Sequence, residues 1–464
     1  GLSYKDIERS KNMFVLGLLY WIYNRPLDST IRFLNDKFSK KPEIAEANIK
    51  VLKDGYHYGE TTEIFGETYT IKKADIGAGE YRNIMGNEAT VLGLVSAARQ
   101  ANLPLFYGSY PITPASDILH ELSGLKNFGV TTFQAEDEIA AVSSAIGAAF
   151  GGSLGVTSSS GPGIALKGEA IGLAVMLELP LVILNVQRAG PSTGMPTKTE
   201  QSDLLQAMYG RNGESPVAIV APATPADCFD AAFEASRIAL EHMVPVYYLS
   251  DGYLGNGSEP WKFPQQKDLK PIRVRFEPPR NGEAAKFLPY LRNENGVRSW
   301  AIPGTAGIEH RVGGLEKQEN TGDVSYDPDN HQRMTDLRQA KVDKIADFIP
   351  LQKVDSGNKK GDVLVLGWGS TYGTIRTVVR ELMKEGMDIS HAHIKYLNPF
   401  PKNLGDLLKG FSHVVVPEIN NGQLVRLIRD KYLIPAKGIN KIKGRPFFVD
   451  ELKQEIKEAI SIKT

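Results

Sequence analysis

Arg188 stands where an apolar run ends and a loop rich in glycine, proline and hydroxyl groups begins. The loop reads VQRAGPSTGMPTKTEQSD over residues 186–203 and follows the run PLVILN. A guanidinium at the carboxyl end of a parallel strand is well placed to hold a carboxylate through two parallel hydrogen bonds. Ser192, Thr193 and Thr197 offer further donors to the same anion. The pattern favours an anion site, and the alternative is an arginine that only binds loop carbonyls.

A second loop, FYGSYPITPAS, holds Thr113 between two prolines. Pro111 and Pro114 flank Ile112 and Thr113, and each proline fixes its own φ and biases the residue before it toward an extended conformation. The Thr113 hydroxyl is therefore expected on a rigid loop. A purely structural turn is the other interpretation of the same motif.

Three consecutive acids, Glu136, Asp137 and Glu138, stand at the start of a segment made almost wholly of small residues, IAAVSSAIGAAFGG. Acids at a helix N-terminus commonly only compensate the helix dipole. The small residues behind them would also let another backbone or a cofactor approach the helix closely. Both interpretations remain open on the residues alone.

The chain contains one cysteine, Cys228. A single thiol excludes a disulfide framework and any iron–sulfur cluster held by thiolates of this chain alone. Cys228 lies in TPADCFDAAFEASRIALEHM, whose apolar residues recur at helical spacing behind a threonine cap. We expect a small buried thiol, and any iron–sulfur chemistry must come from a partner.

Charge and hydropathy exclude two classes of partner. The 464 residues carry 54 basic and 54 acidic side chains without a basic block, so we expect no nucleic-acid partner. The apolar run NMFVLGLLYWIY is too short to span a bilayer, and AIGLAVMLELPLVILNV is interrupted by Glu178 and Pro180. We therefore expect no membrane segment.

The pattern divides the chain into five stretches. Residues 1–76 are predicted to form helices with a polar tail, with NMFVLGLLYWIYN buried, and 77–86 a linker. Residues 87–251 alternate short apolar strands with helices, which predicts a parallel sheet with helices on both faces and chemistry at the carboxyl ends of its strands. The Gly-, Pro- and Asn-rich residues 252–345 are expected to form an irregular arm. Residues 346–464 read as a second α/β unit.

A glycine-rich turn, GWGSTYG at 367–373, follows a predicted strand and opens a predicted helix. It lacks the full glycine spacing of a dinucleotide loop, and the next predicted strand, ISHAHIKYL, does not end in the acid that such a loop requires. The signal for a nucleotide there is weak.

Six motifs occur together and in order: GNEA, YPITPAS, EDEIAA, SSSGPG, QRAGPSTGMPTKTEQSD and PEINNGQL. In this combination the chain, from about residue 83 to its end, resembles the alpha subunit of 2-oxoacid:ferredoxin oxidoreductases, most closely the 2-oxoglutarate type. The resemblance implies an α/β fold, with a thiamine-diphosphate-binding-type parallel sheet domain followed by a transketolase C-terminal-like α/β domain. Residues 1–76 resemble the C-terminal part of the gamma domain that some members fuse ahead of alpha.

The resemblance also implies an activity. A 2-oxoacid, 2-oxoglutarate in the closest type, is decarboxylated with thiamine diphosphate, the acyl group passes to coenzyme A, and electrons leave singly to ferredoxin. The beta subunit is expected to hold the diphosphate, magnesium and the iron–sulfur cluster, in a cytoplasmic dimer of αβ heterodimers. The alternatives are pyruvate, branched-chain or arylpyruvate substrates, or a non-catalytic scaffold subunit.

The family's glutamate that binds the aminopyrimidine ring is expected at Glu138. Its spacing to Gly163 matches the family pattern better than that of Glu136. The resemblance further implies that the pyrimidine end of the cofactor is contacted by the loop residues Tyr110, Pro111 and Ile112.

Substrate contacts are implied by the same resemblance. Arg188 matches the arginine that binds the 1-carboxylate of the 2-oxoacid, and Thr113 matches a contact beside the reacting carbonyl. Thr197 matches a threonine of the same pocket. The loop from Ser192 onward is expected to help select the substrate side chain.

Overall fold

The computed structural model describes residues 3–62, 66–280 and 286–461. It comprises two compact units, Gly1–Gly79 and Glu80–Thr464. The candidate site residues all lie in the second unit.

The first unit is built from three helices: α1 (Tyr4–Ile22), α2 (Asp28–Lys37) and α3 (Pro42–Thr62). Helices α1 and α3 approach closely at two glycines, because a Cβ on Gly17 would lie 1.9 Å from the Leu52 carbonyl oxygen and one on Gly55 2.0 Å from that of Phe14. The expected burial of residues 12–24 is wrong. Within this chain α3 covers only one side of α1, so that Val15 is 56% exposed.

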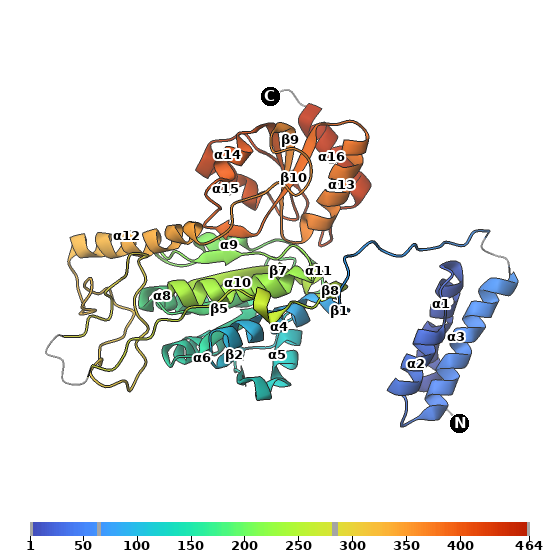
Figure 1. Ribbon diagram of the computed structural model, residues 1–464, viewed down its shortest axis with the longest axis horizontal. Helices are drawn as coiled ribbons and strands as arrows, with labels where there is room; N and C mark the ends of the chain where they lie inside the picture. The colour runs from blue at the N-terminus through green and yellow to red at the C-terminus, as the bar shows by residue number, and fades with distance from the viewer. Residues whose placement is uncertain (1–2, 63–65, 281–285, 462–464) are drawn as a thin grey trace. The chain divides into compact units, whose positions relative to one another are not determined.

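The second unit is organised around a seven-stranded sheet in the order β11-β6-β7-β5-β4-β2-β3. Figure 1 labels three of its strands, β2, β5 and β7, which lie among the helices of this domain. Neighbouring strands are parallel except for the antiparallel pair β11–β6. The strands are β2 (Leu105–Ser109), β3 (Val130–Gln134), β4 (Leu154–Ser159), β5 (Leu181–Gln187), β6 (Ala218–Val220), β7 (Pro245–Asp251) and β11 (Tyr396–Asn398). Every residue of β4, β5 and β7 is buried, which explains their continuous apolar runs. The predicted parallel α/β sheet is confirmed.

Helices alternate with these strands along the chain: α4 (Gly86–Gln100), α5 (Ser116–Ser123), α6 (Glu138–Phe150), α7 (Gly161–Leu166), α8 (Gly168–Leu177), α9 (Leu204–Tyr209) and α10 (Asp227–His242), with the 3₁₀ turn η1 (Lys126–Phe128). Helix α10 packs against α4 and on β5 to β7, while α6 packs on β2 and β4. Cys228 on α10 is fully buried, and burial raises the pKa of its thiol to about 12. The expected small buried thiol is confirmed.

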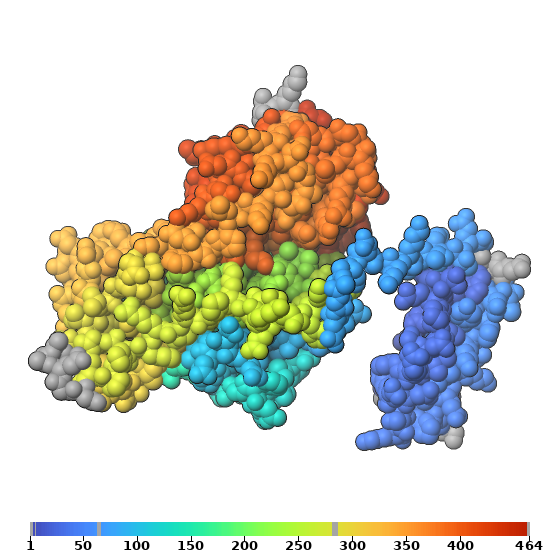
Figure 2. Space-filling model, viewed as in Figure 1, coloured from blue at the N-terminus to red at the C-terminus, as the bar shows by residue number. Residues whose placement is uncertain are grey.

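The stretch between the two α/β domains is largely irregular. It contains α11 (Gly252–Asn256), β8 (Ser258–Lys262), η2 (Gln266–Asp268) and α12 (Pro328–Lys344). Strand β8 pairs with β1 (Tyr81–Met85), so half of the expected linker 77–86 is a strand of this unit. Figure 2 shows the yellow arm packed against the green part of the sheet domain. Trp300 on the arm fixes it there, because its Nε1 donates to the Ala149 carbonyl at 3.0 Å.

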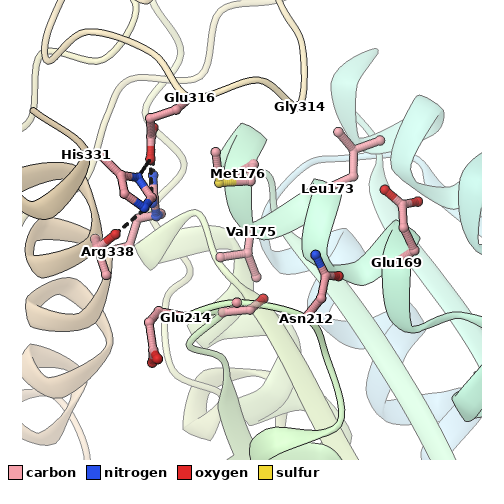
Figure 3. A pocket seen from close by; sticks show the side chains of 14 residues that line it. Glu169, Leu173, Val175, Met176, Asn212, Glu214, Gly314, Glu316, His331 and Arg338 are labelled. Atoms are coloured by element: carbon pink, nitrogen blue, oxygen red, sulfur yellow. Dashed lines mark hydrogen bonds and ion pairs between the residues drawn. The ribbon is translucent and has the colours of Figure 1, made fainter. Parts of the chain in front are cut away.

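A buried acid of the sheet domain anchors this arm, and a second, partly buried acid joins two segments within the arm. Glu178, which follows α8 in the left-handed region at φ 50°, is 1% exposed and pairs with Lys341 at 2.6 Å and with Arg292. Nearby, Glu316 pairs with Arg338 and His331 beside a pocket under the arm (Figure 3). Burial opposes the charge of Glu178, but Lys341 and Arg292 outweigh burial and lower its pKa to about 2.

Replacing Glu178 by Gln should destabilise the second unit by about 3–5 kcal/mol at pH 7, because two buried cations would lose their counter-charge. The pKa of Glu178 is lower in the folded chain than its ordinary 4.5. Its contribution to stability is therefore complete above pH 4.5 and is lost as the pH falls toward 2. Urea unfolding monitored by tryptophan fluorescence measures the difference. Glu319→Gln, which removes a more exposed pair with Arg333 on the same arm, is the matched control and should cost less than about 1 kcal/mol.

The C-terminal domain has a parallel four-stranded sheet in the order β10-β9-β12-β13. Its strands are β9 (Gly361–Trp368), β10 (Ile389–Ile394), β12 (Phe411–Glu418) and β13 (Lys437–Asn440); its helices are α13 (Tyr372–Lys384), α14 (Leu404–Leu408), α15 (Gln423–Tyr432) and α16 (Val449–Ser461), with the 3₁₀ turns η3 (Ile345–Asp347) and η4 (Gly369–Thr371). The run ISHAHIKYL is divided between two sheets, because β10 lies in this sheet and β11 in the larger one.

The glycine turn after β9, residues 367–373, contacts the side chain of Gln201 from the sheet domain. Gly369 has φ +57°, and a Cβ there would lie 2.7 Å from Nε2 of Gln201, which donates to the Trp368 carbonyl. The turn therefore joins the C-terminal domain to the sheet domain. Among the described helices, none is long and apolar enough to cross a bilayer.

Candidate active site at the carboxyl edge of the sheet

Four loops meet at the carboxyl edge of the larger sheet. They follow β2, β3, β4 and β5, whose ends are in register, since Ser109 lies opposite Gln134 and Ser158 and Ser159 lies opposite Asn185. Parallel strands place their carboxyl ends on one side. Every predicted site residue belongs to one of these loops or begins the helix after it.

Arg188 follows β5 directly and is 6% exposed. Its Nη1 donates to the Thr113 carbonyl oxygen at 2.7 Å, while its buried Nε has no acceptor among the described residues. Burial lowers the pKa of the guanidinium and Asp203 partly offsets this. Arg188 and Thr113, both expected to contact the substrate, lie together in the structure, and the contact between them uses the threonine carbonyl. The unpartnered Nε leaves a donor for an anion.

The loop after Arg188 folds back on itself. The Ala189 amide donates to the Lys198 carbonyl, and the Met195 amide donates to the Ala189 carbonyl. Gly194 has φ +51°, and a Cβ there would lie 2.0 Å from the Ala189 carbonyl oxygen. Only glycine fits this turn. Ser192, at φ 55°, and Thr197 are both exposed.

The C-terminal motif PEINNGQL holds the end of this loop. Gln201 exchanges two hydrogen bonds with the Ile419 backbone, at 3.0 and 3.1 Å. Asn420 donates to the Gln201 carbonyl and Gln423 to that of Ser202. The two motifs therefore form one structure, a pairing that sequence reasoning missed although both motifs had been singled out.

A cavity of about 590 Å³ opens between these elements. It is lined by Arg188, Ser192, the start of α7, the loop residues 200–206 and the motif around Asn420. Asp203 on its wall accepts from Asn185 Nδ2 at 2.9 Å, and burial raises the pKa of Asp203. Thr197 does not line this cavity, and neither do the residues of the β2 loop, where Tyr110, Pro111 and Thr113 are exposed and Ile112 is half-buried.

Glu138 begins α6, and Asp137 is the residue that caps it, since its Oδ1 accepts the Ala140 amide at 2.7 Å. The half-buried Glu138 side chain lies against Gly163, where a Cβ would come within 2.9 Å of its Oε1 and 2.0 Å of Ser159 Oγ. Glu136 is exposed. The three acids thus have different environments, and Glu138 is the one packed against the SSSGPG turn.

Lys167 is a buried cation behind Glu138 that sequence reasoning missed. Its Nζ donates to the Glu138 carbonyl and to Thr157 Oγ1, both at 3.0 Å. Burial lowers its pKa to about 8, against the opposing charges of Glu138 and Asp137. The available signal was its place four residues after the SSSGPG motif. Lys167 fixes the first turn of α6 and with it the position of Glu138.

Comparison with known proteins identifies the family. A model described as pyruvate flavodoxin/ferredoxin oxidoreductase, thiamine diphosphate-binding, matches residues 96–327, and pyruvate:ferredoxin oxidoreductase core domain II matches residues 361–452. The chain is 55% identical, over 99% of its length and 70% of the relative's, to the 2-oxoglutarate oxidoreductase subunit KorA of Mycobacterium tuberculosis. It belongs to the 2-oxoacid:ferredoxin oxidoreductase family. It is thus one subunit of a multi-subunit oxidoreductase.

Two further members of this family are similar to the chain. The 2-oxoglutarate synthase subunit KorA of Archaeoglobus fulgidus is 32% identical over 78% of this chain and 94% of its own length. The solved 2-oxoglutarate:ferredoxin oxidoreductase of Magnetococcus marinus, with 2-oxoglutarate, coenzyme A and succinyl-CoA bound, is 31% identical with a TM-score of 0.89, over 98% of this chain and 79% of that one. The family's fold is therefore the fold of this chain.

The carboxyl edge fits the pyrimidine end of thiamine diphosphate. Glu138 offers a half-buried carboxylate that lies against Gly163, and Lys167 holds the start of its helix through the Glu138 backbone carbonyl. The hydroxyls of Ser159 and Ser160 are buried without a hydrogen-bond partner among the described residues. Buried polar groups normally have partners, so a polar ligand at this edge would satisfy them.

Proposed function

We propose that the chain is the alpha subunit of a coenzyme A-acylating 2-oxoglutarate:ferredoxin oxidoreductase, which converts 2-oxoglutarate to succinyl-CoA with one-electron transfer to ferredoxin. The observation that carries the proposal is the buried Arg188 guanidinium on the wall of the 590 Å³ cavity, whose Nε has no hydrogen-bond partner among the described residues. A 2-oxoacid presents a carboxylate of the kind that such a fork binds. The names of the Mycobacterium, Archaeoglobus and Magnetococcus relatives support 2-oxoglutarate as the substrate.

Glu138 is proposed as the catalytic residue. Thiamine diphosphate, when bound, supplies the electron sink for decarboxylation. The Glu138 carboxylate would hydrogen-bond the aminopyrimidine ring and hold a proton there, while Lys167 keeps the start of α6 in place through the Glu138 carbonyl. The exposed loop of Tyr110, Pro111 and Ile112 would contact the same ring.

Arg188 is proposed to bind the 1-carboxylate of the substrate. The bond from its Nη1 to the Thr113 carbonyl fixes the orientation of the guanidinium and leaves Nε for the anion. Ser192 lines the cavity and would contact the substrate side chain. Thr113 and Thr197, whose side chains are exposed at the same edge, would approach the substrate from outside the cavity.

The partners are also proposals. A beta subunit would supply the diphosphate site, magnesium and the iron–sulfur cluster, in a cytoplasmic dimer of αβ heterodimers that reduces ferredoxin. Residues 1–76 would belong to a gamma-type domain. The exposed apolar side chains of α1, among them Val15 and Leu19, support further packing of this unit.

The test is the reduction of a low-potential dye by the chain purified anoxically with its co-expressed beta subunit. We expect reduction that depends on both 2-oxoglutarate and coenzyme A. If only pyruvate, a branched-chain 2-oxoacid or an arylpyruvate is used, the family assignment stands and the proposed substrate is wrong. If no 2-oxoacid reacts although thiamine diphosphate and the cluster are bound, the subunit is a scaffold.

A further inference from the structure

A second cavity, of about 520 Å³, lies at the opposite edge of the larger sheet. Its wall includes residues 240–243 at the end of α10, just before β7 begins at Pro245. The seven residues of β7 span roughly 20 Å before they reach the carboxyl edge at Asp251. This amino-edge cavity is therefore separate from the candidate active site.

The amino-edge cavity is strongly cationic. Glu241 is the only acid among the described residues that line it. Five basic side chains line it as well: Arg237, Lys270, Arg273, Arg275 and Arg298. A chain with zero formal charge thus concentrates positive charge at one recess. Low-dielectric walls strengthen the field of such a group of charges.

These five cations differ in whether the protein supplies them with a partner. Arg237 is bound by Glu234 and Glu241, and Arg298 donates to the carbonyls of Pro289 and Glu178. Lys270 lies 3.6 Å from Glu234. The exposed Arg273 and Arg275, in contrast, have no carboxylate within ion-pair distance among the described residues. Within the part of the chain that the structure describes, these two guanidinium groups are unpaired and available at the mouth of the cavity.

His242 forms part of the cavity wall and is 3% exposed. Neither of its ring nitrogens has a hydrogen-bond partner among the described residues; the ring meets Phe348 edge-on at 5.1 Å. Burial, together with the charges of Arg237 and Lys341, lowers the pKa of His242 to about 4. The neutral ring then carries one unfilled N–H donor. Such a group in a native fold calls for a partner.

We propose that the amino-edge cavity binds a phosphorylated small molecule, with its phosphoryl oxygens held by Arg273 and Arg275 and reached by the ring N–H of His242. Two planar guanidinium forks and a further N–H provide more donors than one carboxylate can accept, and they match the several oxygens of a phosphoryl group. The volume lies within the range of sites for metabolites of nucleotide size. The recess, and the lack of a basic block elsewhere in the sequence, favour a small ligand over nucleic acid.

The test is calorimetric titration of the assembled complex with inorganic phosphate and, separately, with adenosine diphosphate, at constant ionic strength. Saturable binding is expected for at least one probe. The double variant Arg273→Ala/Arg275→Ala should weaken it at least tenfold. Both side chains are exposed, and an unchanged thermal midpoint would verify folding. Arg311→Ala, an exposed arginine of the same arm, is the matched control and should bind within twofold of the unaltered complex.

Three results would overturn the proposal: no saturable binding of either probe, binding by the double variant equal to that of the unaltered complex, or complete competition by chloride at equal ionic strength. The KM for coenzyme A decides whether the phosphoryl group belongs to coenzyme A or to another metabolite. A raised KM for coenzyme A in the double variant would assign the cavity to the phosphate end of that proposed co-substrate. An unchanged KM, with probe binding lost, would assign it to a separate phosphorylated metabolite.

Discussion

Replacing Glu138 by Gln is expected to lower the turnover of the assembled enzyme with 2-oxoglutarate by roughly 10²-fold or more, because the amide cannot hold the proton that the carboxylate shares with the cofactor ring. The amide is nearly isosteric with the carboxylate, so the packing on Gly163 is retained. The loss should therefore appear in kcat while the KM for 2-oxoglutarate changes little. Steady-state dye reduction over a range of 2-oxoglutarate concentrations measures both.

Glu136→Gln is the matched control, because Glu136 is exposed two residues earlier in the same acid cluster. It should retain turnover within about twofold. Near-normal turnover of Glu138→Gln together with a large loss for Glu136→Gln would transfer the role to the other glutamate. Near-normal turnover of both variants would show that neither glutamate at the start of α6 takes part in the reaction.

Replacing Arg188 by Ala should mainly weaken the use of the 2-oxoacid. A buried carboxylate that loses its counter-charge costs about 2–5 kcal/mol, which corresponds to a fall in kcat/KM of roughly 30-fold or more. Arg188→Lys should recover only part of the loss, because an ammonium cannot bind the Thr113 carbonyl and an anion with one planar fork. Initial rates against 2-oxoglutarate concentration, with coenzyme A saturating, give kcat/KM.

Lys198→Ala removes an exposed cation of the same loop and should leave kcat/KM for 2-oxoglutarate unchanged. Retained thiamine diphosphate in Arg188→Ala would show that the site is still assembled. If the rate of Arg188→Ala depends on 2-oxoglutarate concentration as in the unaltered enzyme, Arg188 only stabilises its loop.

The architecture of the sheet domain is encoded in short segments. Runs such as LVILNVQ are apolar throughout because both faces of the sheet are covered. The spacing of apolar residues and the residue types of turns are local properties of the sequence. They therefore also indicated that Arg188 follows a strand and that an acid cluster begins a helix. The burial of Cys228 followed from helical spacing in the same way.

The elements whose burial or strand pairing was predicted wrongly are those that depend on residues far away in the sequence. Residues 12–24 are apolar in sequence, yet their exposure depends on how much of α1 is covered by α3. The run ISHAHIKYL has a single strand pattern, but β11 pairs with β6 across nearly 180 residues. Periodicity carries no information about which sheet a strand will join.

Motif and spacing were enough to indicate which residue types gather at the carboxyl edge, since a parallel sheet brings the ends of its strands together. The tertiary structure alone determines the hydrogen-bond partners: Arg188 binds a carbonyl 75 positions away, and Gln201 binds Ile419. It also determines that Lys167 and His242 are buried away from water. Hydrogen bonds act over about 3 Å and desolvation depends on every atom nearby. Neither can be read from a one-dimensional pattern. Only the tertiary structure shows that nitrogens of Arg188 and His242 have no hydrogen-bond partner among the residues it describes.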